Sequence, residues 1–284
     1  MIRKLKSGKY RLYSRKVRHP RRGGEARARG AVLQAFEASG KFAGTDVQRY
    51  TMPPSNEPPR RILQNEWGLA LHVESARAAE TRRVLIDFGY THETINNNLD
   101  LLQIDVSKLD AMVLIHGHYD HFGGMVGFLQ AHRRKLKPAQ PSRMKVGIGP
   151  DGMGCAAARL PEEKRSAEMM VDDFQHEQAT CFHVKGKGLV VMTSCGHRGV
   201  VNTVEAAIKV SGVSKVHAIL GGFHLMPMSA EYAQETARAM ARFDADCLIP
   251  MHCSGENFFD AAKQAMPGRV VRTSTGTRFT FGSA

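Results

Sequence analysis

The strongest constraint on the fold is the segment 116–121, HGHYDH, which places three imidazoles and a carboxylate directly after an apolar run over 111–115. That run is rich in branched aliphatic residues and predicts a buried strand, and the glycine-containing stretch after the segment predicts a turn into a helix over 122–133. Proteins of the α/β class usually place their chemistry at the carboxyl ends of strands. Imidazole and carboxylate are common zinc ligands, so the sequence predicts an α/β fold with a metal site at this strand end. A histidine-rich surface turn is the alternative interpretation.

The spacing within this segment provides for two metal positions. His116 and His118 are two residues apart, so in an extended chain their side chains point the same way and reach one metal. Asp120 and His121 follow where the chain begins to turn, and their side chains can diverge toward a second position. Two metals roughly 3.5–4 Å apart can share a hydroxide and hold both the attacking and the leaving oxygen. Metal-activated water is therefore the predicted nucleophile, because a zinc-bound water has a pKa of about 7 in favourable sites.

The pattern His-x-His-x-Asp-His after a hydrophobic strand resembles the signature of the metallo-β-lactamase superfamily, and further parts of that signature follow in order. Asp87, at the end of RVLID, resembles the first motif, an Asp that supports the metal loop from behind the ligands. His197, in SCGHRG, resembles the third motif. His252, in PMHC, resembles the last motif. The resemblance extends from about residue 65 to the end of the chain and implies an α/β fold, a four-layer αββα sandwich of the metallo-β-lactamase type.

The resemblance also implies two sets of metal ligands. The first metal would be held by His116, His118 and His197. The second would be held by Asp120, His121 and His252, which would orient water if that site were empty. The expected cofactor is zinc, as one or two divalent ions, and mixed His/Asp sites also accept iron or manganese.

One part of the superfamily pattern is missing. Members usually carry an Asp, sometimes a Cys, that bridges both metals, and it should fall in the stretch ILGGFHL over 219–225. That stretch has no carboxylate, and His224 is its one strong ligand. His224 is therefore open to four interpretations: a metal ligand, a proton donor, a substrate contact, or a hydrogen-bonded histidine in a turn.

Several longer stretches resemble one branch of the superfamily, namely NEWGLALHVE over 65–74, HGHYDHFGG, SCGHRGVVNTV, GGFHL and MHCSG. Members of that branch are described as metal-dependent hydrolases of the β-lactamase superfamily II. Some carry the name of a dihydropterin–ribofuranosylaminobenzene 5′-phosphate synthase, which implies a phosphoribosyl-type substrate and a pterin-related product. The predicted function is a metal-dependent hydrolase acting on a small anionic substrate, with such a synthase as an alternative.

Two further roles follow from position. Asp120 is expected to steer the nucleophile or to shuttle a proton. Arg198 lies one residue past His197, and together with the amides of the loop before Asn202 it is expected to hold a substrate carboxylate or phosphate. An ordinary surface arginine is the alternative.

The net charge of +13 lies almost entirely in the first thirty residues, which hold twelve Lys or Arg and one acidic residue, Glu25. The body is therefore nearly neutral, with a net charge of +2. A basic arm over 1–30 can bind nucleic acid nonspecifically, so a nuclease of the same fold is a second alternative, not favoured because the body is not basic. A solvated extension is the simpler interpretation of the arm.

The predicted organisation has three parts. Residues 1–45 form a basic extension with a short amphipathic helix over 31–45, and residues 46–64 form a linker with four prolines. Residues 65–284 form the catalytic domain, with a substrate-selecting insertion around 151–180. Within the domain we expect a strand hairpin over 68–74 and 83–88, a helix capped by Asn202, a helix over 229–243 capped by Ser229, and closing strands over 269–272 and 277–281.

The five cysteines are scattered and odd in number, which is typical of reduced thiols. Cys195 and Cys253 neighbour proposed ligands, but adjacent residues on a strand point to opposite faces, so neither is expected to bind metal. No apolar run reaches the roughly 18 residues of a membrane span, and the basic N-terminus has no apolar signal core, so the cytoplasm is the expected location. The sequence leaves the oligomeric state open.

Overall fold

The computed structural model describes residues 2–4, 10–12, 40–42, 44–50, 58–136, 145–146 and 174–282. The chain divides into two compact units, Met1–Ala38 and Ser39–Ala284. In the first unit, β1 (Ile2–Lys4) pairs antiparallel with β2 (Tyr10–Leu12). The second unit contains every predicted site residue, and its elements are described below.

The first half of this unit builds a four-stranded sheet in the order β5-β6-β7-β8. Strands β5 and β6 are antiparallel, which confirms the predicted hairpin, and β6, β7 and β8 are parallel. The strands are β5 (Leu71–Arg77), β6 (Glu80–Ile86), β7 (Ala111–Leu114) and β8 (Lys145–Val146). The helices are α2 (His92–Leu101), the 3₁₀ helix η1 (Val106–Lys108), α3 (Tyr119–Phe122) and α4 (Met125–His132).

The second half builds a four-stranded sheet in the order β12-β11-β10-β9. Here β10, β11 and β12 are parallel and β9 is antiparallel to β10. The strands are β9 (Thr180–Val184), β10 (Gly188–Thr193), β11 (Val216–Gly221) and β12 (Cys247–Pro250). The helices are α6 (Val200–Ser211), α7 (Ala230–Ala241), the 3₁₀ helix η4 (His252–Ser254) and α8 (Glu256–Ala265).

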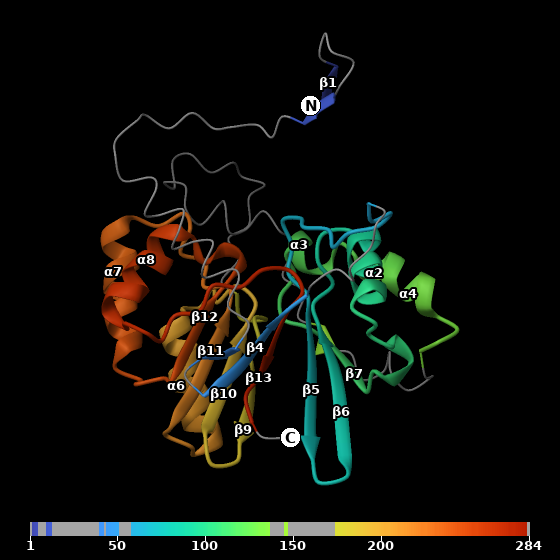
Figure 1. Cartoon of the computed structure of the whole chain (residues 1–284). Helices are drawn as coiled ribbons and strands as arrows, with labels where there is room; N and C mark the ends of the chain where they lie inside the picture. The colour runs from blue at the N-terminus through green and yellow to red at the C-terminus, as the bar shows by residue number, and fades with distance from the viewer. Residues whose placement is uncertain are drawn as a thin grey trace, which may run out of the picture. The chain divides into compact units, whose positions relative to one another are not determined.

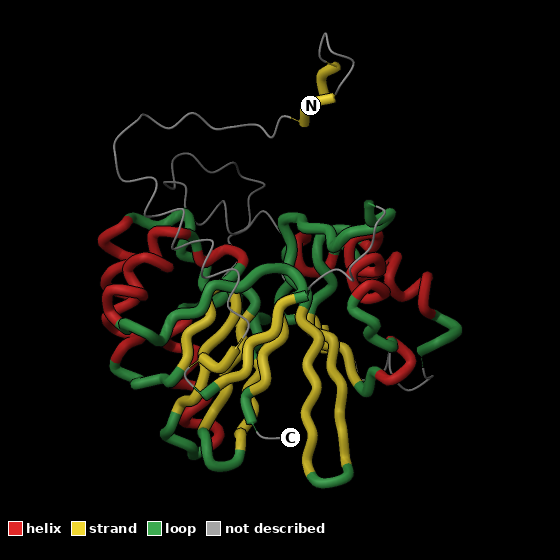
Figure 2. The backbone as a smooth tube through the Cα atoms, in the orientation of Figure 1, coloured by secondary structure: helices red, strands yellow, loops and turns green. Residues whose placement is uncertain are grey.

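Three apolar cores separate four layers, as an αββα sandwich requires. One core joins the two sheets and includes Ile86 and Ile115 from the first and Val190 and Ile249 from the second. A second core lies between the first sheet and α2 and α4, and a third lies between the second sheet and α6, α7 and α8. Figure 1 shows the two groups of helices on the outer faces, and Figure 2 shows the strands between them. The predicted α/β sandwich is confirmed.

The segment before residue 65 differs from the prediction. Instead of a helix reaching residue 45 and a linker from 46, β3 (Gly40–Phe42) and β4 (Thr45–Arg49) form a sheet with β13 (Thr277–Thr280). The alternation of buried and exposed residues along β4 has a period of two, because Thr45 and Val47 face the core. Residues 31–39 and 51–57 lie outside the described residues, as do residues 151–173 of the expected insertion.

Two other predictions about local structure are corrected. Helix α6 begins at Val200 after Gly199, so Asn202 is not its cap and instead donates from Nδ2 to the carbonyl of Arg198 at 2.8 Å. Residues 269–272 make a single bridge, Val270 to Leu248, rather than a strand. The capping of α7 by Ser229 is confirmed, since its Oγ accepts from the Tyr232 amide. Within the described ranges, no helix combines the length and the apolar character needed to cross a bilayer.

Candidate metal centre

Five of the predicted site residues lie within about four residues of strand ends at one edge of the two sheets. Asp87 follows β6, His116 follows β7, His197 follows β10, His224 follows β11 and His252 follows β12. Because the parallel strands of each sheet run the same way, these ends meet at one edge of the sandwich. The topology therefore brings together residues that lie up to 165 positions apart in the sequence.

Three of these residues, none of which is glycine, have backbone conformations in the left-handed region. The φ angles are 58° at Asp87, 50° at His224 and 51° at His252. Such conformations cost on the order of 1–3 kcal/mol each and are kept where the surrounding structure requires them.

The first predicted ligand set is assembled. One ligand atom from each of His116, His118 and His197 lies within 4.8 Å of the others. Their ring centroids are 4.7–4.9 Å apart. His116 is fully buried, its Nδ1 lies 3.3 Å from Ser194 Oγ, and its Nε2 has no hydrogen-bond partner among the described residues. A buried nitrogen of this kind suits a metal ligand.

The second predicted set is assembled beside it. Ligand atoms of Asp120, His121 and His252 lie within 4.8 Å of one another. Asp120 Oδ2 is 3.2 Å from His252 Nε2 and 3.6 Å from His121 Nε2. Burial would raise the pKa of Asp120, but the hydrogen bond and the charge of His252 and His121 outweigh it and lower the pKa. The carboxylate is therefore ionised at neutral pH.

Asp87 lies behind the histidines, where the sequence placed it. It is fully buried, and its two oxygens have separate partners. Oδ1 accepts from the Ile115 amide at 2.8 Å, and Oδ2 lies 2.9 Å from His121 Nδ1. Burial opposes protonation of His121, but the hydrogen bond and charge of Asp87 reverse this and raise its pKa. Because Asp87 holds Nδ1, the other ring nitrogen of His121 faces the site.

The surroundings of His116 disfavour its protonated form. Burial, followed by the neighbouring histidines His121, His197 and His118, lowers the pKa of His116 well below its ordinary value. A neutral imidazole carries the lone pair that a metal ion requires. The donor set thus fits a divalent metal, and the cluster of His and Cys side chains can hold one.

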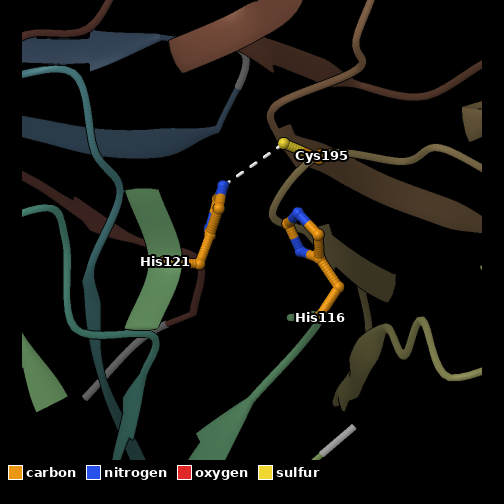
Figure 3. Close-up of side chains that lie close together, drawn as sticks. All are labelled: His116, His121 and Cys195. Atoms are coloured by element: carbon orange, nitrogen blue, oxygen red, sulfur yellow. Dashed lines mark hydrogen bonds between the residues drawn. The ribbon is translucent and has the colours of Figure 1, made fainter. Parts of the chain in front are cut away.

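The prediction that Cys195 and Cys253 point away from the metal site is wrong. Cys195 Sγ lies 3.3 Å from His121 Nε2 and 3.3 Å from Cys253 Sγ. Figure 3 shows Cys195 directed at His121, with His116 beside it. The argument from strand alternation fails because His252–Ser254 forms a 3₁₀ helix and Cys195 follows the end of β10. Both thiols are buried, as are His116, His118 and His121.

His224 belongs to the same cluster. Its ring centroid is 4.1 Å from that of His197, and its ligand atom lies within 4.8 Å of those of Cys195 and His197. Its backbone amide donates to Cys253 Sγ at 3.3 Å. The position at the end of β11 therefore contributes an imidazole to the cluster.

Sequence reasoning missed Glu177, because it falls inside the stretch treated as an insertion and belongs to no motif. Its carboxylate accepts from the amides of His197 and Arg198, both at 2.9 Å, and so fixes the loop that carries His197. Burial raises the pKa of Glu177, and these two hydrogen bonds partly offset that rise. The Arg198 amide is thus engaged, which corrects the expectation that the loop amides receive a substrate anion. The Arg198 side chain itself is exposed.

Two aromatic rings adjoin the cluster and were also missed. Phe174 stacks on His197, with centroids 4.1 Å apart and planes 6° from parallel. Trp67 lies 5.1 Å from the ring of His252 and is half exposed. Trp67 is the one tryptophan of the chain. It lies in the stretch NEWGLALHVE, and this position was the sequence feature that could have identified it as a residue of the site.

Comparisons with known proteins bear on this arrangement. A family model described as the metallo-beta-lactamase superfamily matches residues 76–252. The 7,8-dihydropterin-6-methyl-4-(beta-D-ribofuranosyl)-aminobenzene-5'-phosphate synthase of Methanocaldococcus jannaschii is 25% identical over 267 residues, covering 75% of this chain and 90% of that protein. An uncharacterized protein of the same organism is 27% identical over 210 residues, covering 61% and 80%.

Among solved structures, Tm1679, described as a metal-dependent hydrolase of the beta-lactamase superfamily, matches with a TM-score of 0.52. The sequence identity is 21%, and the match covers 77% of this chain and 93% of that one. At this identity the likeness shows the fold alone. It agrees with the four layers described above.

Proposed function

The chain belongs to the metallo-β-lactamase superfamily, and on that premise we propose that it is a metal-dependent hydrolase that uses metal-activated water on a small anionic substrate. The observation that carries the proposal is the convergence of two ligand sets, His116/His118/His197 and Asp120/His121/His252, each within 4.8 Å. When bound, divalent ions would supply Lewis acidity, which makes water more acidic and polarises the electrophile. Zinc is the expected metal, with iron or manganese as alternatives.

The chain's own residues have distinct tasks in this proposal. His116, His118 and His197 hold one metal position, and the first two of them are buried. Asp120, with His121 and His252, holds the second position, and its ionised carboxylate orients the attacking water and accepts its proton. His224, next to His197, stands where it can donate a proton to the leaving group.

Substrate binding is assigned to the rim of the cluster. The exposed side chain of Arg198 lies one residue from His197 and would pair with a carboxylate or phosphate on the substrate. Glu177 fixes the backbone on which Arg198 sits. The charge of Arg198 is the basis for expecting an anionic substrate.

Metal analysis of protein purified without chelators tests the proposal. The wild type should bind up to two equivalents of divalent metal, and His116→Ala and His252→Ala should each lose about one. Both variants should lose at least about 100-fold in hydrolysis of a panel of small phosphate and carboxylate esters. His183→Ala, a histidine of β9 outside both ligand sets, is the control and should behave as the wild type. Wild-type protein that binds no divalent metal would contradict the proposal.

A synthase is the second candidate, because the similarity to the synthase named above spans 90% of that protein's length. The product in that protein's name joins a pterin to a ribofuranosylaminobenzene phosphate. The test is incubation with reduced pterins and a ribofuranosylaminobenzene phosphate, with the joined product sought by mass spectrometry. Formation of that product without hydrolysis of the ester panel would favour the synthase.

A further inference from the structure

We propose that the thiolate of Cys195 is a metal ligand placed between the two histidine sets, where it takes the role of the carboxylate that the chain lacks after β11. The inference rests on the proposed metal dependence and deepens it. Cys195 lies two positions before His197, whereas the bridging ligand was expected in the stretch 219–225.

The location of the sulfur is the first argument. Cys195 is 2% exposed and follows the end of β10. Its Sγ lies within 4.8 Å of the ligand atoms of His116 and His121, which belong to different sets. The sulfur also lies within 4.8 Å of the ligand atoms of His197 and His224, and within 4.8 Å of those of His252 and Cys253. Cys195 itself belongs to neither predicted set and lies next to both.

The second argument is the lack of room for any side chain at the two glycines at the end of β11, Gly221 and Gly222. A Cβ at Gly221 would lie 1.6 Å from the carbonyl oxygen of Thr193. A Cβ at Gly222 would lie 2.1 Å from the carbonyl oxygen of Ser194 and 2.9 Å from Cys253 Sγ. Neither position accepts any side chain, so an aspartate cannot be placed there. The same contacts place the end of β11 beside the end of β10, which Cys195 follows.

The distances suit coordination. Two ligands of one tetrahedral zinc, a sulfur at roughly 2.3 Å and a nitrogen at roughly 2.1 Å, lie about 3.6 Å apart. The separation of Cys195 Sγ from His121 Nε2 is 3.3 Å. On metal binding the S–H bond breaks, its proton passes to solvent, and the sulfur–metal bond forms, so no oxidant or reductant is needed.

Cys253 is assigned a positioning role. Its Sγ lies 3.3 Å from Cys195 Sγ and receives the His224 amide at 3.3 Å. These contacts hold the second sulfur against the first. They also identify a competing chemistry, since two thiols at this distance could be oxidised to a disulfide.

Cobalt substitution tests the assignment. Protein stripped with a chelator and reloaded with Co²⁺ should show sulfur-to-cobalt charge-transfer absorption in the near ultraviolet. Cys195→Ser should abolish that absorption and weaken Co²⁺ binding by at least about tenfold, since even residues that only support a ligand contribute that much. Cys181→Ser removes an exposed thiol on β9 and should leave both unchanged. Cys253→Ser should retain the absorption.

A second measurement needs no variant. Bound metal should protect Cys195 from alkylation by iodoacetamide in the wild type, while Cys181 is labelled equally with and without metal. Peptide mass spectrometry measures both sites, and it also detects a Cys195–Cys253 disulfide.

Four results would overturn the assignment: cobalt bound by the wild type without charge-transfer absorption, absorption that survives in Cys195→Ser, equal labelling of Cys195 with and without metal, or a Cys195–Cys253 disulfide in the metal-loaded protein. These are distinguishable from failure of the proposed function. If neither the wild type nor Cys181→Ser binds cobalt, the metal dependence itself is wrong. If cobalt binds normally without sulfur-to-cobalt absorption, the thiolate assignment is wrong but the metal dependence still holds.

Discussion

At the scale of single residues, the site depends on buried groups that orient others. Asp87 shows this most clearly, because one oxygen holds the Ile115 amide and the other lies against His121. A buried acceptor with two partners cannot be lost without leaving a donor unsatisfied. The conformation of the metal loop is therefore linked to a carboxylate that is too deeply buried to contact substrate.

We expect Asp87→Asn to lower the free energy of unfolding by about 1–3 kcal/mol, because the amide can serve Ile115 but presents the wrong group to His121. Metal affinity should fall about 10–100-fold, as it does when a ligand loses its orienting partner. Urea denaturation and metal titration measure the two effects. Asp246→Asn, which alters a similar carboxylate–histidine pair with His217 away from the cluster, should leave metal affinity unchanged. Equal metal affinities in Asp87→Asn and wild type would exclude this role.

At the scale of elements, the ends of strands and helices differ in how well they tolerate a side chain in place of a terminal glycine. Gly221 ends β11 with a φ of 128° and has a neighbouring carbonyl in the space of any Cβ. Gly212 ends α6 with a φ of 70° in open space. The backbone geometry alone favours glycine at both positions, whereas only at Gly221 is a side chain also excluded.

Gly221→Ala should therefore destabilise the protein by about 4 kcal/mol or more, or prevent folding, since the strand ends must separate. Gly212→Ala should cost only about 1 kcal/mol, the cost of a left-handed residue at a helix end. Thermal unfolding of both variants measures the difference. Comparable melting temperatures would show that β10 and β11 can separate without loss of packing.

Helix α8 is tied to the following segment by a pair of side chains. Arg272 donates to Glu256 at 2.7 and 2.6 Å and lies 3.9 Å from the centroid of the Phe259 ring. The hydrogen bonds from Arg272 lower the pKa of Glu256 below its ordinary 4.5, and burial only partly opposes them. The folded state therefore prefers the ionised carboxylate.

The stability from this pair should be present above pH 4.5 and should be lost as the pH falls through the lower folded pKa. Glu256→Gln should remove that part of the acid sensitivity, at a cost near neutral pH of at most about 1 kcal/mol, because Glu256 is largely exposed and screened. Urea denaturation between pH 3 and pH 7 would measure it, with Glu235→Gln, an exposed residue of α7, as control. An unchanged pH profile in Glu256→Gln would rule out the linkage.

At the scale of the whole molecule, most of the net charge lies outside the unit that carries the metal cluster. The first thirty residues carry most of the net charge of +13, and the unit with the cluster begins at Ser39. The strands β3 and β4 belong to that unit, so a deletion to residue 45 would cut into it. A deletion of residues 1–38 removes the basic arm and leaves the sheet intact.

We expect the protein lacking residues 1–38 to keep the melting temperature and metal content of the full chain. Its affinity for a single-stranded oligonucleotide should fall, and the dependence of that affinity on salt should weaken, because counterion release scales with the number of basic contacts. Fluorescence anisotropy at several salt concentrations measures this. If the full chain cut nucleic acid and the shortened protein kept its metal but not that activity, the nuclease alternative would gain support.

The sequence by itself determined the class of fold and most of the cluster. The apolar run before HGHYDH and the Ser229 cap express local chemistry, namely periodicity, ligand type and capping, that can be recognised in one stretch of chain. The later histidines, His197 and His252, were identified through the resemblance of their motifs to the superfamily signature. For the same reason the hairpin of β5 and β6 was predictable.

Only the tertiary structure decided the rest. Residues 45–49 form a strand because β13, more than 200 residues away, pairs with them. Cys195 and Cys253 face the histidines because a 3₁₀ turn and the close approach of two strand ends replace the strand alternation assumed for them. Glu177 supports His197 through backbone amides, which no motif records. Contacts of this kind depend on three-dimensional proximity between distant segments, and that information is absent from any local pattern.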